Sequence, residues 1–365
     1  GILEQHLTKH TPRWASQICG ISEDDIIGLA NLIGENKKTF LRLGYGFTRQ
    51  RNGANSMHAV ASIAAITGSW LYEGGGALLA NSGIYHWDKT LIEGLDAIDP
   101  AVRLLDQSRI GEILTGVPST LSGGPPVKAL FIQNTNPMSV APNLNLVRSG
   151  FEREDLFTCV HEQFMTETAE MADIILPATM FMEHDDFYQS GGHQHIHFGP
   201  KLITPPGECR SNHEVICDLA KRLDASHEGF NLSAREIIDQ TLVKSGWNNL
   251  ETLEKDKWFD VQPDFETSHF INGFGHADKL WHFRADWKEQ QKVWGVEARQ
   301  LQDADLIKEM PALPDHWEVI EESNLSFPFR LVTAPARHFL NSSFTETTTS
   351  QKRDPVRLPS SWAAP

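Results

Sequence analysis

Apolar runs alternate with amphipathic stretches along the first half of the chain, and this alternation predicts its elements. Four short apolar runs are typical of buried strands, at residues 39–43, 127–132, 156–160 and 173–176. Helical spacing of apolar residues occupies residues 22–34, 56–70, 110–114, 144–149, 212–223 and 234–244, and a further helix is expected at 100–107. Strands that alternate with helices predict an α/β fold with a doubly wound, Rossmann-like parallel sheet.

Length and pattern together predict two domains. At 365 residues the chain exceeds one typical core. We assign residues 1–21 to a leading segment and residues 22–182 to the α/β domain. The regular alternation stops after Pro177, so residues 183–329 are expected to form a second, irregular α+β domain, and residues 330–365 to begin a third.

Charge and cysteine usage narrow the partners and the location. Lys and Arg number 32 and Asp and Glu number 48, which gives a formal net charge of −16. Nucleic acids and anionic membranes would repel such a chain, so neither is expected as a partner. No apolar run approaches the roughly 20 residues of a membrane helix. The four cysteines show no Cys-x-x-Cys spacing and fit a reducing, cytoplasmic compartment.

Glycines follow the first predicted strand. Gly44 and Gly46, with Gln50 and Asn52 close behind, come before a predicted helix. A glycine-rich turn at a helix N-terminus is a natural anion site, which predicts a phosphate-binding loop. The alternative is a tight strand-to-helix turn without a ligand.

Amides follow the second strand. Asn134 and Asn136 lie just beyond the strand that ends at Ile132, and Pro137 restricts Asn136 to an extended shape. Amides at this edge of an open sheet can bind phosphate or sugar groups. The alternative is an ordinary asparagine-rich turn.

Acidic and hydroxyl residues follow the third strand. Glu162, Thr166 and Thr168 come after it, and Asp173 precedes the fourth. A carboxylate can accept paired N–H donors from a guanine edge, which is the role expected for Glu162. For Thr166 and Asp173 the alternative is capping of a turn and a strand.

Three histidines alternate further along, at His193, His195 and His197. On a strand they would share one face and could hold zinc or another borderline metal. The alternative is a polar strand that faces solvent or a ligand, and no metal ligand is assigned. The clustered acids Glu183, Asp185 and Asp186 either raise one another's pKa or form a solvated loop.

These segments resemble, in the same order, those of the molybdopterin oxidoreductases of the dimethyl sulfoxide reductase type. The motifs are Gly44-Tyr45-Gly46 with Asn52-Gly53, Asn134-Thr135-Asn136-Pro137, Thr166-Glu167-Thr168-Ala169, Ala172-Asp173-Ile174-Ile175-Leu176-Pro177, Glu183 with Asp185 and Asp186, and the tail from Leu331-Val332-Thr333 to Asn341-Ser342.

The resemblance implies a molybdenum or tungsten oxidoreductase in which two molybdopterin guanine dinucleotides hold the metal. Such an enzyme transfers an oxygen atom, or oxidises or reduces a small-molecule substrate. The cofactor-binding residues that the resemblance implies are Gly44, Gly46, Gln50, Asn52, Asn134, Asn136, Pro137, Glu162, Thr166, Thr168, Asp173, Asn341 and Ser342.

Two parts of the family's pattern are not found in this sequence, namely the segment that supplies the metal ligand and the C-terminal barrel. We therefore expect an internal fragment, inactive and without cofactor when isolated, whose partners are the remaining domains of the parent chain and an electron-transfer protein. No catalytic residue is assigned. Two alternatives stay open, a non-catalytic nucleotide-binding module and a metal-dependent hydrolase that uses the His193 face.

Overall fold

The computed structural model describes residues 1–50, 52–287, 310–318, 323–329, 336–345 and 347–353, and the chain divides into two compact units. Unit 1 comprises Gly1–Tyr85, Gln189–His195 and Asp260–Arg330, and unit 2 comprises His86–Tyr188, Ile196–Phe259 and Leu331–Pro365. The domain boundaries expected at residues 22, 183 and 330 stay predictions. No helix in the described parts of the chain has the length and apolar character to cross a membrane.

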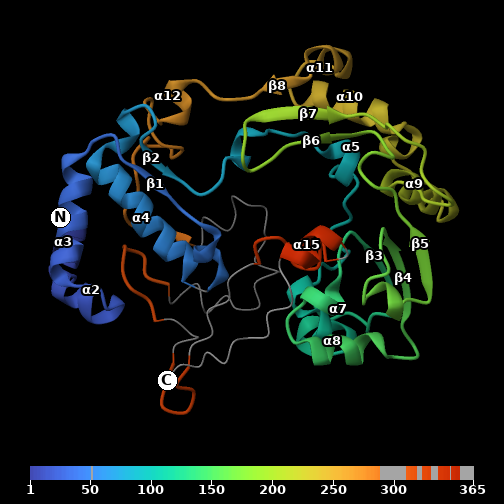
Figure 1. Ribbon diagram of the computed structural model, residues 1–365, viewed down its shortest axis with the longest axis horizontal. Coiled ribbons are helices and arrows are strands. Elements are labelled where there is room, and N and C mark those ends of the chain that lie inside the picture. The colour runs from blue at the N-terminus through green and yellow to red at the C-terminus, as the bar shows by residue number, and fades with distance from the viewer. Residues whose placement is uncertain (51, 288–309, 319–322, 330–335, 346, 354–365) are drawn as a thin grey trace. The chain divides into compact units, whose positions relative to one another are not determined.

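Unit 1 is built around a short parallel sheet. Its helices are α1 (Ile2–Leu7), α2 (Pro12–Cys19), α3 (Glu23–Glu35), α4 (Gly53–Thr67) and α12 (Phe265–Ser268), its strands are β1 (Phe40–Arg42) and β2 (Gly76–Leu78), and its 3-10 turns are η1 (Tyr45–Arg49), η2 (Ser69–Leu71) and η3 (Ser82–Ile84). Phe40 lies opposite Gly76 in the sheet, and α4 packs along both strands (Figure 1).

Capping residues determine where the first helices begin. The hydroxyl of Ser22 accepts a bond from the Asp25 N–H, and acidic side chains fill the first turn of α3, as the sequence predicts. At α2 the hydroxyl of Thr11 likewise caps the helix, and Pro12 occupies its first turn. Residues 1–21, which the sequence analysis assigned to a leading segment, form α1 and α2.

Unit 2 contains a three-stranded parallel sheet in the order β3-β4-β5. Its strands include β3 (Ala129–Gln133), β4 (Phe157–Glu162), β5 (Ile174–Pro177) and β6 (Asp186–Tyr188), and its helices are α5 (Thr90–Glu93), α6 (Ile110–Leu114), α7 (Pro137–Val140), α8 (Leu144–Phe151), α9 (Asn212–Arg222), α10 (Ala234–Lys244), α11 (Leu250–Asp256) and α15 (Thr348–Arg353). Short 3-10 turns are η4 (Gln107–Arg109), η5 (Pro118–Thr120), η6 (Ala169–Met171) and η7 (Glu228–Asn231).

A third sheet has the order β6-β7-β8. Strand β7 (His195–Gly199) pairs antiparallel with β6, so that Asp186 lies opposite Gly199, and the remaining strand is β8 (Trp258–Asp260). The sequence did not predict these strands, because each is three to five residues long and is held by a partner elsewhere in the chain.

The core of unit 2 lies on one face of its parallel sheet. Ile132 and Val160 from the strands pack against Leu114 of α6 and Val147 of α8. The two helices approach closely because Gly150 leaves room, since a Cβ at that position would lie 2.5 Å from the Cβ of Leu114. In Figure 1, α7 and α8 lie side by side next to this sheet.

The opposite face of the same sheet has no helical layer among the described residues. Phe131, Phe157 and Ile174 alternate with the core residues along their strands and are 39%, 47% and 45% exposed. The α/β class with parallel strands is confirmed. The structure differs from the predicted doubly wound sheet in having two separate parallel sheets, one in each unit.

Most of the predicted helices and strands are present, with boundaries that shift by a few residues. The helix expected at residues 100–107 was wrong, because this stretch forms turns and only η4 follows, with the Asp106 carboxylate capping it through the Ser108 N–H. The region after Asn248 was expected to be irregular and nevertheless contains α11, whose cap is the side chain of Asn249.

We expect Gly53→Ala to destabilise unit 1 strongly. Gly53 begins α4, and a Cβ there would lie 1.8 Å from the backbone oxygen of Phe47, which cannot move aside as a flexible side chain would. The free energy of unfolding should fall by about 3 kcal/mol, measured by urea titration. The control is Gly28→Ala within α3, where no atom lies within 4 Å and alanine should be neutral or stabilising by up to about 1 kcal/mol. Equal effects of the two substitutions would contradict the clash.

Candidate functional site

A cavity of about 540 Å³ lies within unit 2, next to the carboxyl ends of β3 and β4. Asn134 follows β3 directly and Gln163 follows β4, and both side chains line the cavity. Further polar lining comes from Thr179, His184, Asp185, Asp186, Ser211, Asn212 and His213, and apolar lining comes from Leu91, Ile92, Phe181, Phe230, Ile237 and Ile238.

Backbone conformation and hydrogen bonds orient the two amides. Asn134 has φ +57°, in the left-handed region that asparagine tolerates better than most residues. The Gln163 Nε2 donates to the Thr179 carbonyl at 2.8 Å, and the Gln163 N–H donates to Glu162 Oε1 at 2.7 Å. The amide of Gln163 is therefore fixed at the cavity wall, while the Glu162 carboxylate is engaged with the backbone.

A second polar group comes from the segment after β5. The hydroxyl of Thr179 and Nδ1 of His184 are 2.7 Å apart, and His184 Nε2 lies 3.9 Å from Asp186 Oδ2. Burial raises the pKa of Asp186, although the bond from the Phe187 N–H and the nearby His184 pull it down. Burial also raises the pKa of the Tyr188 phenol. A carboxyl whose pKa lies above its ordinary value, next to an imidazole, can exchange a proton with a bound ligand.

Asn136 and Thr168 do not line this cavity but join the loops beside it. The Thr168 hydroxyl donates to Asn136 Oδ1 at 2.7 Å and accepts from the Met138 N–H at 3.0 Å. The Asn136 amide donates to Glu167 Oε2 at 2.8 Å, and this bond lowers the pKa of Glu167. Thr168 is fully buried and Asn136 is 5% exposed. Pro137, also buried, begins α7 directly after Asn136.

The remaining predicted residues of unit 2 lie at different edges of the sheet. The Thr166 hydroxyl accepts from the Ala169 N–H at 3.2 Å, so it caps the turn as predicted. Asp173 precedes β5 and accepts a bond from the Thr158 N–H at 2.7 Å. Because the strands are parallel, Asp173 lies at the amino end of the sheet, opposite the edge that carries Asn134 and Gln163.

The first predicted loop belongs to unit 1. Gly44 and Gly46 are exposed after β1, and Gln50 follows η1. Asn52 is buried, and its amide donates to the Trp317 carbonyl at 3.1 Å, while its Oδ1 has no partner among the described residues. Two different sheets therefore carry the predicted loops, and the single sheet edge that the sequence suggested is not what the topology shows.

The predicted C-terminal residues lie in an exposed turn. Asn341 has φ +53°, and the Ser342 carbonyl accepts a bond from the Thr345 hydroxyl at 2.9 Å. Residues Leu331, Val332 and Thr333 of the same motif lie outside the described residues.

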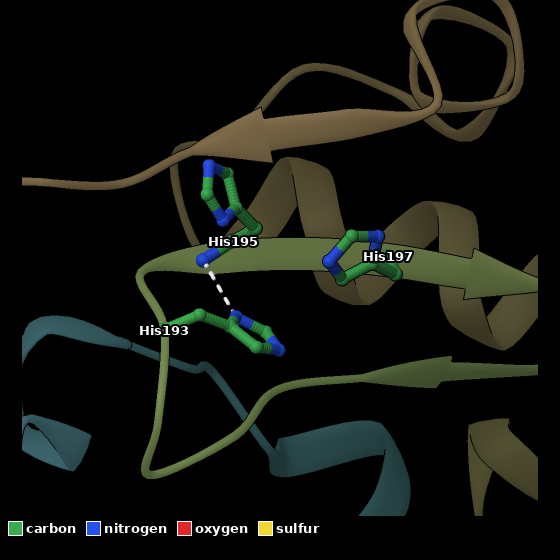
Figure 2. Close-up of side chains that lie close together, drawn as sticks. All are labelled: His193, His195 and His197. Atoms are coloured by element: carbon green, nitrogen blue, oxygen red, sulfur yellow. Dashed lines mark hydrogen bonds between the residues drawn. The ribbon is translucent and has the colours of Figure 1, made fainter.

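The alternating histidines lie close together on and just before β7, as Figure 2 shows. One ring nitrogen from each of His193, His195 and His197 lies within 4.8 Å of the other two. His193 Nδ1 accepts a bond from the His195 N–H at 3.0 Å. The spacing of the three rings suits a metal ion.

Sequence reasoning missed several residues that the structure brings to the cavity or beneath it. Gln163, one position after Glu162, lines the cavity, whereas Glu162 does not. Thr179 and His184 lie in a segment without period. His161 is fully buried between Gln133 and the Arg210 carbonyl. Its position next to Val160 in the apolar run of β4 could have indicated in the sequence that it is buried.

Comparison with known proteins shows the family to which this chain belongs. A family model described as molybdopterin oxidoreductase matches residues 27–222. Probable oxidoreductase YoaE of Bacillus subtilis (strain 168) is 34% identical over 94% of this chain and 47% of its own length. Trimethylamine-N-oxide reductase of Haemophilus influenzae is 25% identical over 95% of this chain and 47% of its own length.

Further relatives agree with these matches. Dimethyl sulfoxide reductase DmsA of Escherichia coli (strain K12) is 29% identical over 60% of this chain and 28% of its own length. Among solved structures, acetylene hydratase from Pelobacter acetylenicus has a TM-score of 0.54 at 17% identity, covering 71% of this chain and 40% of that chain, which is a likeness of fold. The chain spans about half the length, or less, of the curated relatives it matches.

Thr168→Val should destabilise unit 2, because it keeps the volume of the side chain and removes a buried hydroxyl with two partners. The Met138 N–H would lose its acceptor, and Asn136 Oδ1 would lose one of its two donors because the Thr168 N–H still bonds to it, so we expect the free energy of unfolding to fall by about 2 kcal/mol. Thr166→Val is the matched control, since it removes one partly exposed cap and should cost about 1 kcal/mol. A smaller loss at Thr168 than at Thr166 would refute the role of the network.

The raised pKa of Asp186 predicts a pH-dependent stability. The folded protein holds the proton of the Asp186 carboxyl more tightly than the unfolded chain does. The carboxyl therefore lowers the free energy of unfolding as the pH rises from its ordinary pKa of 3.8 through its higher pKa in the folded protein. The Asp186 side chain is 46% exposed, so water screens this effect, and Asp186→Asn should unfold at a slightly higher temperature than wild type at neutral pH, with no difference below pH 3.8.

Asp96→Asn is the control of opposite sign for this experiment. The bond from His227 lowers the pKa of Asp96, so the carboxylate stabilises the fold above its ordinary pKa and loses that effect as pH falls. Its loss should lower the unfolding midpoint at neutral pH. If the unfolding midpoints of Asp186→Asn and wild type changed with pH in the same way, the inferred effect of burial on Asp186 would be ruled out.

Proposed function

Because the chain belongs to the molybdopterin oxidoreductase family, we propose that its unit 2 cavity binds the nucleotide end of a molybdopterin guanine dinucleotide. The observation that carries this proposal is the meeting of Asn134 and Gln163 on one cavity wall. They follow adjacent parallel strands, at the edge where open α/β sheets bind their ligands.

The size and lining of the cavity fit one nucleotide. A volume of about 540 Å³ suits a small ligand rather than a whole dinucleotide, so the pterin end would extend outside it. Phe230 and Ile237 offer apolar contact for the faces of a base, and the amides of Asn134 and Gln163 offer donors and acceptors for its edge. Ser211 and Asn212, at the start of the eleven-residue helix α9, suit a phosphate.

A second dinucleotide arm would use the loop after β1 in unit 1. Gly44 and Gly46 leave the backbone open to a close approach, because no atom lies within 4 Å of a Cβ built at either position. The Asn52 Oδ1, buried without a partner among the described residues, is a free acceptor next to this loop. Gln50 supplies a further amide.

The whole protein would then be a molybdenum or tungsten oxidoreductase acting on a small-molecule substrate. The bound metal supplies the redox chemistry, either transfer of an oxygen atom or removal of electrons from the substrate. The residues of this chain bind and orient the cofactor. His184 and Asp186 can hold a proton at Nε2 or at a carboxyl oxygen near the ligand. The remaining domains of the parent chain and an electron-transfer protein complete the assembly.

Nucleotide binding by the purified chain tests this proposal. GDP is titrated into wild type and into a double variant carrying Asn134→Gly and Gln163→Leu, with heat of binding as the readout. Glycine tolerates the left-handed backbone at position 134, so the variant loses the amides without strain. Loss of two hydrogen bonds should weaken binding by about tenfold to a hundredfold.

Glu162→Gln is the matched control, because its carboxylate bonds to the backbone and lies outside the cavity lining. It should bind GDP as wild type does. A wild-type chain that binds no GDP, or a double variant that binds it unchanged, would remove the support for this cavity. Loss of binding in Glu162→Gln alone would return the guanine-reading role to Glu162.

A further inference from the structure

We propose that His6, His10 and Asp315 form a binding site in unit 1 for a divalent first-row transition-metal ion, with Zn²⁺ as the probe. The ligands are the Nε2 atoms of the two imidazoles and the Asp315 carboxylate. The site is independent of the nucleotide cavity of unit 2, and its residues come from the two ends of the described sequence of unit 1.

The donor atoms already stand at the separations that a bound ion requires. His10 Nε2 lies 2.8 Å from Asp315 Oδ1, and His6 Nε2 lies 3.5 Å from Asp315 Oδ2. One atom from each of the three residues lies within 4.8 Å of the others. Metal–ligand bonds of about 2.0–2.2 Å place neighbouring ligand atoms about 3 Å apart, which is close to the observed arrangement.

The hydrogen bonds of His10 favour a cation at this point. His10 Nδ1 lies 2.9 Å from the His6 carbonyl oxygen, and a carbonyl can only accept, so the proton of the neutral ring stands on Nδ1. The lone pair of Nε2 then faces the Asp315 carboxylate, which is also an acceptor. Two acceptors at this distance require a positive charge between them, which either a second proton on the ring or a metal ion supplies. A backbone carbonyl that holds the other ring nitrogen is the usual companion of a metal-bound histidine.

The surrounding contacts hold Asp315 in place. Its backbone carbonyl accepts from the Asn55 amide of α4 at 2.6 Å, and its Oδ1 accepts from the His316 N–H at 2.7 Å. The preceding carbonyl, that of Pro314, lies 3.1 Å from His6 Nε2 and accepts the proton of that nitrogen, so His6 must move this proton to Nδ1 to bind an ion, after which the carbonyl is a candidate fourth oxygen ligand. The carboxylate therefore need not reorganise to receive an ion.

The two histidines are also held in position and partly withdrawn from water. Their rings contact each other at 4.5 Å between centroids, and the edge of His10 meets Trp14 at the same separation. The side chains of His6, His10 and Asp315 are 19%, 12% and 26% exposed, so an ion can reach them and then loses most of its water. Two imidazoles with one carboxylate select zinc, iron or cobalt over magnesium and calcium, which prefer oxygen ligands.

Metal uptake by the purified chain tests the site. Protein stripped with a chelator is dialysed against Zn²⁺, and zinc per chain is measured by mass spectrometry. Wild type should bind one equivalent that the His6→Ala/His10→Ala variant loses. Asp315→Asn, which keeps the acceptor for the His316 N–H, should weaken binding by at least about tenfold. Zn²⁺ should raise the unfolding midpoint of wild type and leave that of these variants unchanged.

Two control variants separate this site from other histidines. His193→Ala/His195→Ala removes the cluster near β7, and His227→Ala removes a histidine paired with a single carboxylate, Asp96, at 3.0 Å. Both should keep the equivalent assigned to His6 and His10. Zinc that persists in His6→Ala/His10→Ala, or that disappears only with His193→Ala/His195→Ala, overturns the proposal, as does a wild type that takes up none.

A labelling experiment on wild type covers the case in which a variant does not fold. Diethyl pyrocarbonate modifies accessible imidazole nitrogens, and peptide mass mapping reports each histidine separately. Zn²⁺ should protect His6 and His10 at least severalfold while His282, which is half-exposed, is labelled as before. Equal labelling of His6 and His10 with and without Zn²⁺ overturns the site.

Discussion

The hydroxyl of Thr168 joins two loops that follow neighbouring strands, and the arrangement of the candidate cavity depends on this contact. It donates to Asn136 beyond β3 and accepts from Met138 at the start of α7, while the Asn136 amide reaches Glu167 beyond β4. The two bonds of the Thr168 hydroxyl are withdrawn from water, where an unmade bond is costly. With the loops fixed together, Asn134 and Gln163 are held at one wall. The residues that resemble a ligand-binding motif thus divide into some that shape the loops and others that face the cavity.

Local signals account for what could be predicted from the sequence. Ser22 caps α3 as expected, and Ser211 and Ser233 cap α9 and α10, helices whose ranges the apolar period predicted, because a cap and an amphipathic period are properties of a short stretch. The separation into two parallel sheets, the hairpin of β6 with β7 and the approach of His184 to Thr179 depend on contacts between distant segments. No periodicity of apolar residues in the sequence predicts these long-range contacts. The contact of His10 with Asp315 is the extreme case, since the two residues lie near opposite ends of the described sequence.

Family membership and local geometry answer different questions about this chain. The match to molybdopterin oxidoreductases covers residues 27–222. It does not say which side chain of a loop faces a ligand. In the loop after β4 the carboxylate of Glu162 turns to the backbone and the amide of Gln163 turns to the cavity, a choice made by one bond to Thr179. The acidic residues near Asp186 are a second example. Burial of the Asp186 side chain raises its pKa, and the neighbouring carboxylates in the sequence are not the cause.

Among the described residues, one side of the β3-β4-β5 sheet carries exposed apolar side chains, and this has a consequence for the chain in solution. Phe131, Phe157 and Ile174 offer water a strip of hydrocarbon, which attracts similar strips on other copies. The net charge of −16 opposes that attraction through long-range repulsion. Dissolved ions shorten the reach of this repulsion to about 8 Å at physiological ionic strength, and they leave the apolar attraction intact. Dilute buffers therefore favour dispersed molecules, and added salt favours clustering.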